Sequence, residues 1–522
     1  MRLRLSLAAL FILFLTGCMG TTTSAPMPVT GLFLVTVNPR ATATPTPFQP
    51  MLPTGTATSI PPTDTATPPP DTPVPLPSAT SLPPTATQPP ATPQPVERTT
   101  YLLYLTMDYA GHSLYVDQQT AYTNHSSDTL YELVLAVEPN FWEGRFNLRQ
   151  ITADGMPVNY TLQSHRLTVS LPQSLPPGGS TLIALSYDIL LPPKSSGLVY
   201  GYTDYQANLV DWFPFIVPYK PGAGWLLHDV YPWGENLVYD ASDFEVNLRF
   251  VDPYNPPVVA ASAPGESNNE WTRYRLSNAR TIAFSMSPYY LVSTEYADGI
   301  SVSSYYFSGH DWGGQAAAAK GAQAVSVYSD KFGPYPYQSL SIVETGLPDG
   351  MEFDGLVFLS SAFFAGYDGT NANNLTVIGV HEIAHQWWFG LVGNDQSLEP
   401  WLDEAMATYS EHIFMENTTP GLVGWWWNSR VNAYEPHGYV DTSVYNGGSF
   451  RTYTNAVYLV GAYFMDSIRE RVGDEAFFAF LKSYITQMGH QRATADDWFR
   501  ILRETTSTDI SDIQSRYFQY SH

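Results

Sequence analysis

The fold of this 522-residue chain is decided by the stretch Thr376-Val-Ile-Gly-Val-His-Glu-Ile-Ala-His-Gln-Trp-Trp-Phe-Gly390. Its apolar residues recur at helical spacing and share one face, which carries Val380, Ile383, Ala384 and Trp387. Gly390 is of the residue type that commonly ends a helix. The stretch therefore predicts one helix that packs an apolar face into a core.

A second helix is predicted from Leu398 to Phe414. Pro400 lies near its first turn, where a missing N–H costs little. Glu404 and Glu411 are seven residues apart, so both carboxylates are expected on one face of this helix.

The first helix carries a His-Glu-x-x-His motif, which predicts a zinc site. His381 and His385 are four residues apart and can aim two imidazole nitrogens at one point. With Glu404 as the third ligand, one coordination position stays open for water, as in catalytic zinc sites. Glu382 can reach that water without ligating the metal and act as general base. The alternative is a buried helix with two histidines that only satisfy hydrogen bonds.

Glu411 is a candidate for a supporting role behind the metal. A carboxylate on this face can hydrogen-bond the far nitrogen of a ligand histidine and fix its orientation. The alternative for Glu411 is a solvated helix carboxylate.

Eighteen residues separate His385 from Glu404, and other motifs accompany that spacing. Asp349-Gly-Met-Glu352-Phe resembles a Gly-x-Met-Glu-Asn motif, and Val457-Tyr458-Leu-Val-Gly461 resembles a catalytic-tyrosine helix. With these features, roughly residues 100 to 522 resemble the gluzincin aminopeptidases, the family of aminopeptidase N and leukotriene hydrolase. The resemblance implies an all-β, saddle-like N-terminal domain followed by a mixed α/β, mainly helical, thermolysin-like catalytic domain.

The resemblance also implies how a peptide is held. Glu352 would pair with the free α-ammonium, a charge-assisted contact that lets an enzyme count from the N-terminus. The backbone groups of Gly350 and Met351 would align the peptide as an added strand.

The resemblance assigns the oxyanion donor to Tyr458. Its hydroxyl would stabilise the carbonyl oxygen as the carbon becomes tetrahedral. Tyr453 and Tyr463 lie close by in the sequence and stay open as alternatives.

The chain also departs from the family pattern. An acidic or amide residue that helps Glu352 is expected within 206–214, but no residue there matches clearly. Because the sequence stops at His522, we expect no long helical C-terminal domain. Four further positions differ from the motifs: Asp349, Phe353, Asp403 and Ala405.

The N-terminus predicts a bacterial lipoprotein. Residues 1–17 form a basic and then apolar signal peptide, and Leu-Thr-Gly-Cys18 resembles a lipobox. Cys18 is the only cysteine in the chain and would carry the lipid anchor. The alternative is an ordinary secretory signal or a weak membrane anchor. Residues 18–98 are rich in Thr, Pro and Ala and predict a disordered tether.

Two folded domains are predicted after the tether. Residues 99–295 contain short β-rich runs separated by turn residues and predict an all-β domain. Residues 296–522 predict the zinc metallopeptidase domain. The net charge of −24 argues against a nucleic-acid partner, which requires a basic face.

These features predict an extracytoplasmic, lipid-anchored metallopeptidase with one Zn²⁺ per chain, which releases amino acids from peptide or protein N-termini. One alternative is a catalytically inactive surface module that binds or scaffolds. Another is an endopeptidase, or a different hydrolase, using the same zinc site. The sequence does not indicate an oligomeric state.

Overall fold

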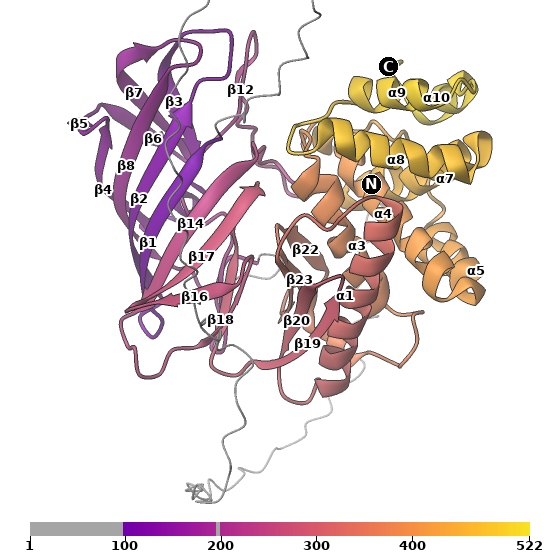
Figure 1. The fold of residues 1–522 in the computed structure, drawn as a ribbon, viewed down its shortest axis with the longest axis horizontal. Helices are drawn as coiled ribbons and strands as arrows, with labels where there is room; N and C mark the ends of the chain where they lie inside the picture. Colours follow the sequence, from indigo (N-terminus) through magenta and orange to yellow (C-terminus); the bar gives the residue numbers. More distant parts are fainter. Residues whose placement is uncertain (1–97, 195–198) are drawn as a thin grey trace, which may run out of the picture. The chain divides into compact units, whose positions relative to one another are not determined.

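Figure 1 shows the computed structural model, which describes residues 98–194 and 199–522. The predicted signal peptide, Cys18 and the tether up to residue 97 lie outside the described residues. Within the described ranges, no helix is both long enough and apolar enough to cross a membrane.

The first half is built from β-sheets, as predicted. The largest sheet has the strand order β16-β17-β14-β1-β2-β8-β4-β5. Alternate residues of β1 point into the core, so Leu103 and Leu105 are fully buried. Its strands are β1 (Thr100–Asp108), β2 (Ser113–Thr123), β4 (Phe146–Ala153), β5 (Met156–Pro157), β8 (Ser180–Leu190), β14 (Ser242–Phe250), β16 (Gly265–Asn268) and β17 (Trp271–Ala279).

Smaller sheets complete this half, in the orders β11-β3-β7-β6, β15-β18-β10-β9 and β12-β13. The β-rich runs at 101–107, 131–137, 167–171 and 182–187 correspond to strands β1, β3, β7 and β8, and only Val137 lies just beyond its strand. The remaining bounds are β3 (Leu130–Ala136), β6 (Tyr160–Gln163), β7 (Arg166–Leu175), β9 (Gly201–Tyr202), β10 (Ala207–Leu209), β11 (Phe215–Ile216), β12 (Tyr219–Lys220), β13 (Gly224–Trp225), β15 (Val258–Ala261) and β18 (Phe284–Ser287).

The second half opens with a five-stranded sheet in the order β19-β20-β21-β23-β22. The pairs β20–β21 and β21–β23 are parallel, and β22 joins β23 antiparallel as an edge strand. The predicted boundary at residue 296 falls inside β19. The strands are β19 (Leu291–Ala297), β20 (Ile300–Tyr306), β21 (Ser339–Thr345), β22 (Gly350–Phe353) and β23 (Leu356–Ser360).

Helices form the rest of this half and are coloured from red through orange to yellow in Figure 1. Helix α3 contacts α1, α4, β22 and β23, so it lies between helices and sheet. The longer helices are α1 (Asp311–Lys331), α3 (Asn374–His385), α4 (Trp401–Thr418), α7 (Gly461–Val472), α8 (Asp474–Met488), α9 (Ala495–Thr505) and α10 (Ser511–Tyr517).

Both predicted helices are present, with shifted ends. The first is α-helical as far as His385 and continues as the π-helical turn η2 (Gln386–Leu391). Gly390 therefore lies inside the last turn and does not end the helix. A Cβ there would lie 2.5 Å from both Asp354 Oδ1 and the Tyr337 hydroxyl, so close packing requires the glycine. The second helix, α4, begins at Trp401.

A buried arginine joins the β half to the zinc helix. Arg280 is 4% exposed and donates from Nε to the Phe389 carbonyl at 2.7 Å, and from its other nitrogens to Tyr239, Leu391 and Gln491 carbonyls. Its backbone N–H donates to Asp354 at 2.8 Å. One guanidinium therefore satisfies four backbone carbonyls from three separate segments.

We expect Arg280→Met to destabilise the protein by about 3–5 kcal/mol, because it leaves buried carbonyls and the Asp354 carboxylate without a cation. Urea denaturation followed by tryptophan fluorescence measures this. Arg500→Met is the control, since Arg500 pairs with Glu504 at the surface and its loss should leave the midpoint unchanged. Equal midpoints for Arg280→Met and wild type would contradict the role of Arg280.

Candidate metal centre

Three ligand atoms converge between α3 and α4. Glu404 Oε2 lies 3.2 Å from His381 Nε2 and 3.6 Å from His385 Nε2. The three ligand atoms all lie within 4.8 Å of one another, and each side chain is at most 5% exposed. Two imidazoles and one carboxylate around one point are the donor set of a catalytic zinc ion. The three residues therefore form a zinc site that fits one Zn²⁺.

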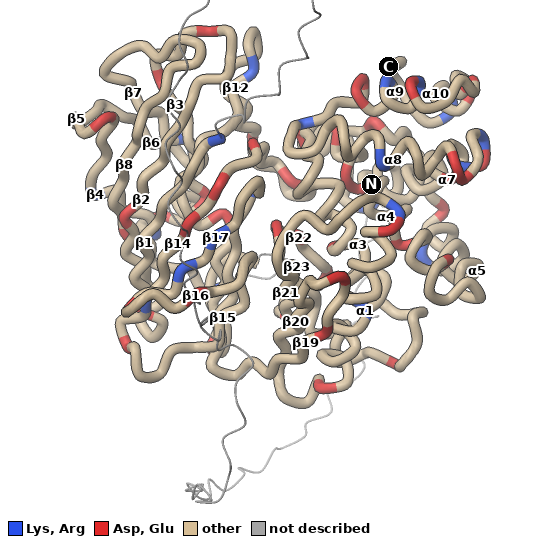
Figure 2. Tube along the Cα trace, in the orientation of Figure 1, with Lys and Arg blue, Asp and Glu red and all other residues tan. Residues whose placement is uncertain are grey.

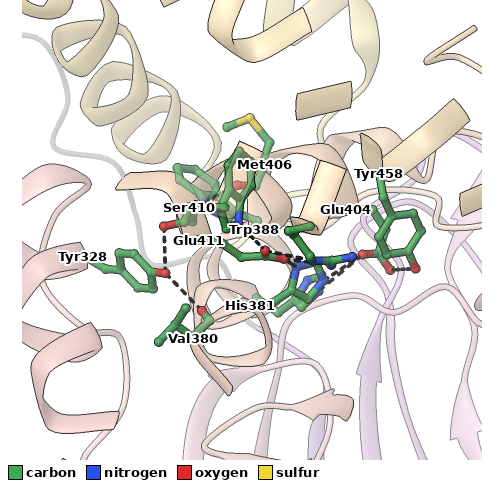
Figure 3. A network of polar contacts seen from close by, with 12 residues as sticks. Tyr328, Val380, His381, Trp388, Glu404, Met406, Ser410, Glu411 and Tyr458 are labelled. Atoms are coloured by element: carbon green, nitrogen blue, oxygen red, sulfur yellow. Dashed lines mark hydrogen bonds and ion pairs between the residues drawn. The ribbon is translucent and has the colours of Figure 1, made fainter. Parts of the chain in front are cut away.

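Figure 3 shows Glu411 behind His381, on the side away from Glu404. Its Oε1 lies 3.0 Å from His381 Nδ1, and it also accepts hydrogen bonds from Arg430 and Trp426. Because Nδ1–H donates to this carboxylate, the Nε2 lone pair of His381 is free to face the metal position. His385 Nδ1, by contrast, has no partner among the described residues.

The electrostatics of the site also fit a cation. Burial disfavours protonation of His381, but Glu404 and Glu411 outweigh it and raise its pKa to about 9. The pKa of His385 also rises to about 9, since Glu352 and Glu404 outweigh burial. Two histidines held so strongly toward the charged form indicate an excess of negative charge, which a divalent ion would neutralise.

Glu382 lies beside this point without belonging to the ligand set. Its ligand atom groups with those of Glu352 and His385 within 4.8 Å. Burial raises its pKa well above the ordinary value. A Cβ at position 350 would overlap the Glu382 carboxylate, so Gly350 is what lets β22 approach it.

The structure brings Tyr458, and neither neighbouring tyrosine, onto the ligands. Tyr458 lies in the π-helical turn η7 (Asn455–Val460) and its hydroxyl donates to Glu404 Oε1 at 2.6 Å (Figure 3). Its ring stacks on His381. The Tyr463 hydroxyl instead donates to Asn432. Tyr453 contacts the ring of Tyr458, and its hydroxyl has no partner among the described residues.

Glu352 lies on the edge strand β22, 6% exposed, and accepts a 3.4 Å hydrogen bond from Gln396. Gln396 also donates to Asp403 at 3.0 Å. Phe353, where the family motif has Asn, is buried and packs edge-on against Phe358. With Phe353 at this position, Glu352 still lies beside the metal position.

Sequence reasoning missed Glu235. Burial raises the pKa of its carboxyl, and the charges of Glu352, Glu404, Asp403 and Glu382 raise it further. Its Oε2 is buried and has no partner among the described residues. Glu235 lies in a loop between strands, in a run with no motif or periodicity, so no local signal identifies it.

An acidic or amide residue that assists Glu352 was expected in the segment 206–214. Gln206 and Asp211 are both of the right type, and they lie in different places. Gln206 faces away, bonding to the Glu344 carbonyl at 2.8 Å and to Thr345. Asp211 lines a cavity of about 230 Å³ together with Glu235 and Glu352. The expected region thus supplies a carboxylate to this cavity through Asp211.

Comparison with known proteins gives the same picture. Residues 317–517 match the family model described as peptidase family M1 domain. Aminopeptidase M1-C of Oryza sativa subsp. japonica is 25% identical over 292 residues, which cover 52% of this chain and 33% of that protein. Aminopeptidase N of Lactobacillus delbrueckii subsp. lactis is 22% identical over 433 residues, covering 78% and 50%. The chain thus spans between a third and a half of these relatives.

The fold is that of solved two-domain enzymes. The M1 zinc metallopeptidase from Deinococcus radiodurans superposes with a TM-score of 0.60 at 17% identity, covering 81% of this chain and 94% of that one. A point mutant of that enzyme bound to a Tyr-Ser-Ala substrate gives a TM-score of 0.60 at 17% identity, covering 82% and 95%. Residues 317–517 thus match the peptidase family M1 domain, and the described chain has the fold of two-domain M1 zinc metallopeptidases with three zinc ligands in place.

Proposed function

We propose that this chain hydrolyses peptide bonds and releases amino acids from the free N-termini of peptides or proteins. The observation that carries the proposal is Glu352, a buried carboxylate grouped with Glu382 and His385 within 4.8 Å. The relatives' names and the Tyr-Ser-Ala substrate of the Deinococcus mutant support it. The extracytoplasmic, lipid-anchored location stays a prediction from the sequence.

The buried carboxylates favour an aminopeptidase over an endopeptidase. Burial raises the pKa of both Glu352 and Glu235, so each carboxylate is costly to ionise without a cationic partner. An α-ammonium supplies that partner in a charge-assisted contact. An internal peptide bond would instead place a neutral amide against these groups, leaving their charge uncompensated.

The edge strand provides the alignment. On one side β22 pairs with β23, from Gly350 opposite Leu359 to Phe353 opposite Leu356. No described strand pairs with its other side. An extended peptide would add there, with its terminal amine at Glu352.

The chemistry would use Glu382 and Tyr458. Zinc, when bound, acidifies water and polarises a carbonyl. Glu382 would take the proton of the attacking water and pass it to the leaving amine. Its burial suits this task, because the raised pKa makes the Glu382 carboxylate a stronger base for the proton of the water. The Tyr458 hydroxyl would turn from Glu404 to the carbonyl oxygen as that oxygen gains charge.

The function itself is tested with one peptide in two forms. The zinc-loaded protein should cleave a peptide with a free α-amine and leave its N-acetylated form intact, because acetylation removes the charge that Glu352 would bind. Mass spectrometry of the products measures this. Cleavage of both forms at an internal bond would show an endopeptidase, and cleavage of neither would favour an inactive binding module.

Glu382→Gln and His385→Ala should separate catalysis from metal binding. The amide cannot accept a proton, so Glu382→Gln should lower kcat by about 10²- to 10⁴-fold while retaining one zinc. His385→Ala should lose zinc as well as activity, because it removes a ligand. Plasma mass spectrometry gives the metal content. Stoichiometric zinc in His385→Ala would refute the ligand assignment.

Tyr458→Phe should lower kcat by about 10²- to 10³-fold with little change in KM, since the hydroxyl would act mainly in the transition state. Tyr463→Phe is the matched control, because its hydroxyl contacts Asn432 away from the ligands. Steady-state kinetics on a fluorogenic aminoacyl substrate measures both. Comparable kcat values for Tyr458→Phe and wild type would transfer the role to Tyr453.

A further inference from the structure

The cavity beside Glu352 has features that the proposed reaction does not use. It is lined by Glu138 and Asp211 in addition to Glu235 and Glu352, and none of the described residues that line it is Lys or Arg. Its apolar lining includes five aromatic residues, which are Trp142, Tyr200, Tyr239, Phe353 and Phe389. The space is therefore apolar along its sides and carries carboxylates.

The carboxylates that line this cavity act on one another through their charges. The charges that raise the pKa of Glu235 are those of Glu352 and of residues at the metal centre. Those that act on Asp211 are Glu138 and Glu352. Glu352 thus acts on both Glu235 and Asp211, while the Glu138 carboxylate lies 2.8 Å from His165 Nδ1.

Asp211 is held in place by a hydrogen bond, and no described Lys or Arg lines the cavity beside it. It accepts a 2.8 Å hydrogen bond from the Tyr239 hydroxyl, and its backbone φ of 47° suits Asp or Asn. Burial raises its pKa to about 7, in spite of that hydrogen bond. The Tyr200 hydroxyl, also buried on this wall, has no partner among the described residues. The part of the cavity around Asp211 would therefore gain from a hydrogen-bond donor that carries positive charge.

We propose that this cavity receives the first side chain of the substrate and selects a long cationic one, arginine or lysine. This inference rests on the proposed function, which places the α-ammonium at Glu352. The methylene groups of such a side chain would pack along the aromatic walls, and its charged end would reach Asp211 and Glu138. Long-range charge acts in the same direction, because acidic positions occur throughout both halves in Figure 2 and the net charge is −24.

L-Arginine and L-citrulline test the proposal, because citrulline has nearly the shape of arginine and no charge. Neither is hydrolysed, so binding to the zinc-loaded wild-type protein is measured by calorimetry independently of activity. Arginine should bind at least about tenfold more tightly, as expected for a charge-assisted contact in a buried site. Equal affinities, or tighter binding of citrulline, would overturn the proposal even if peptides are cleaved. Failure to cleave any free-amine peptide would overturn only the proposed reaction.

Asp211→Asn should bring the two affinities to within about threefold, since the amide keeps the Tyr239 contact and removes the charge. Asp128→Asn is the matched control, because Asp128 also accepts a tyrosine hydroxyl, that of Tyr219 at 3.0 Å, but does not line the cavity. Preference for arginine should persist in the control. An unchanged preference in Asp211→Asn, with Glu138→Gln also unchanged, would refute the assignment of these carboxylates.

Discussion

An excess of buried negative charge governs the design of this protein. Glu352, Glu382, Asp403 and Glu404 are all at most 6% exposed and lie around two histidines. Each buried ion costs several kcal/mol unless it is paired. Within the described part of the chain, the nearby Arg430 is engaged by Glu411. A cation from outside the chain, such as zinc, would stabilise the ionised form of the remaining carboxylates.

The fold meets this constraint by bringing three segments together. Helix α3 supplies the two imidazoles and Glu382, α4 supplies Glu404 and Glu411, and β22 supplies Glu352. Gly350 removes the side chain that would collide with Glu382, so the edge strand can come close. Arg280 fixes the end of the zinc helix to the β half through the Phe389 and Leu391 carbonyls. A peptide amine would then supply a second cation in a position set by rigid elements.

Two departures from ideal helices occur where the site needs them. The zinc helix ends in the π-helical turn η2, and Tyr458 lies in the π-helical turn η7. Such turns insert an extra residue and re-aim the side chains around them, which is why they are frequent at functional sites. Hydrophobic periodicity predicted the helix around His381 but not the turn, because η2 has the same apolar residues as an ordinary helical turn.

The sequence by itself determined the zinc ligands, since His381 and His385 share a helix and their separation fixes their relative direction. It also determined the β half, because alternating burial is a local property of each strand. Only the tertiary structure decided which other carboxylates lie in the same cavity as Glu352. Glu235 and Asp211 come from irregular segments, and the packing of distant elements rather than any local period places them in the same cavity. Carboxylates that are far apart in the sequence and meet in one cavity cannot be recognised from a pattern within any single stretch of residues.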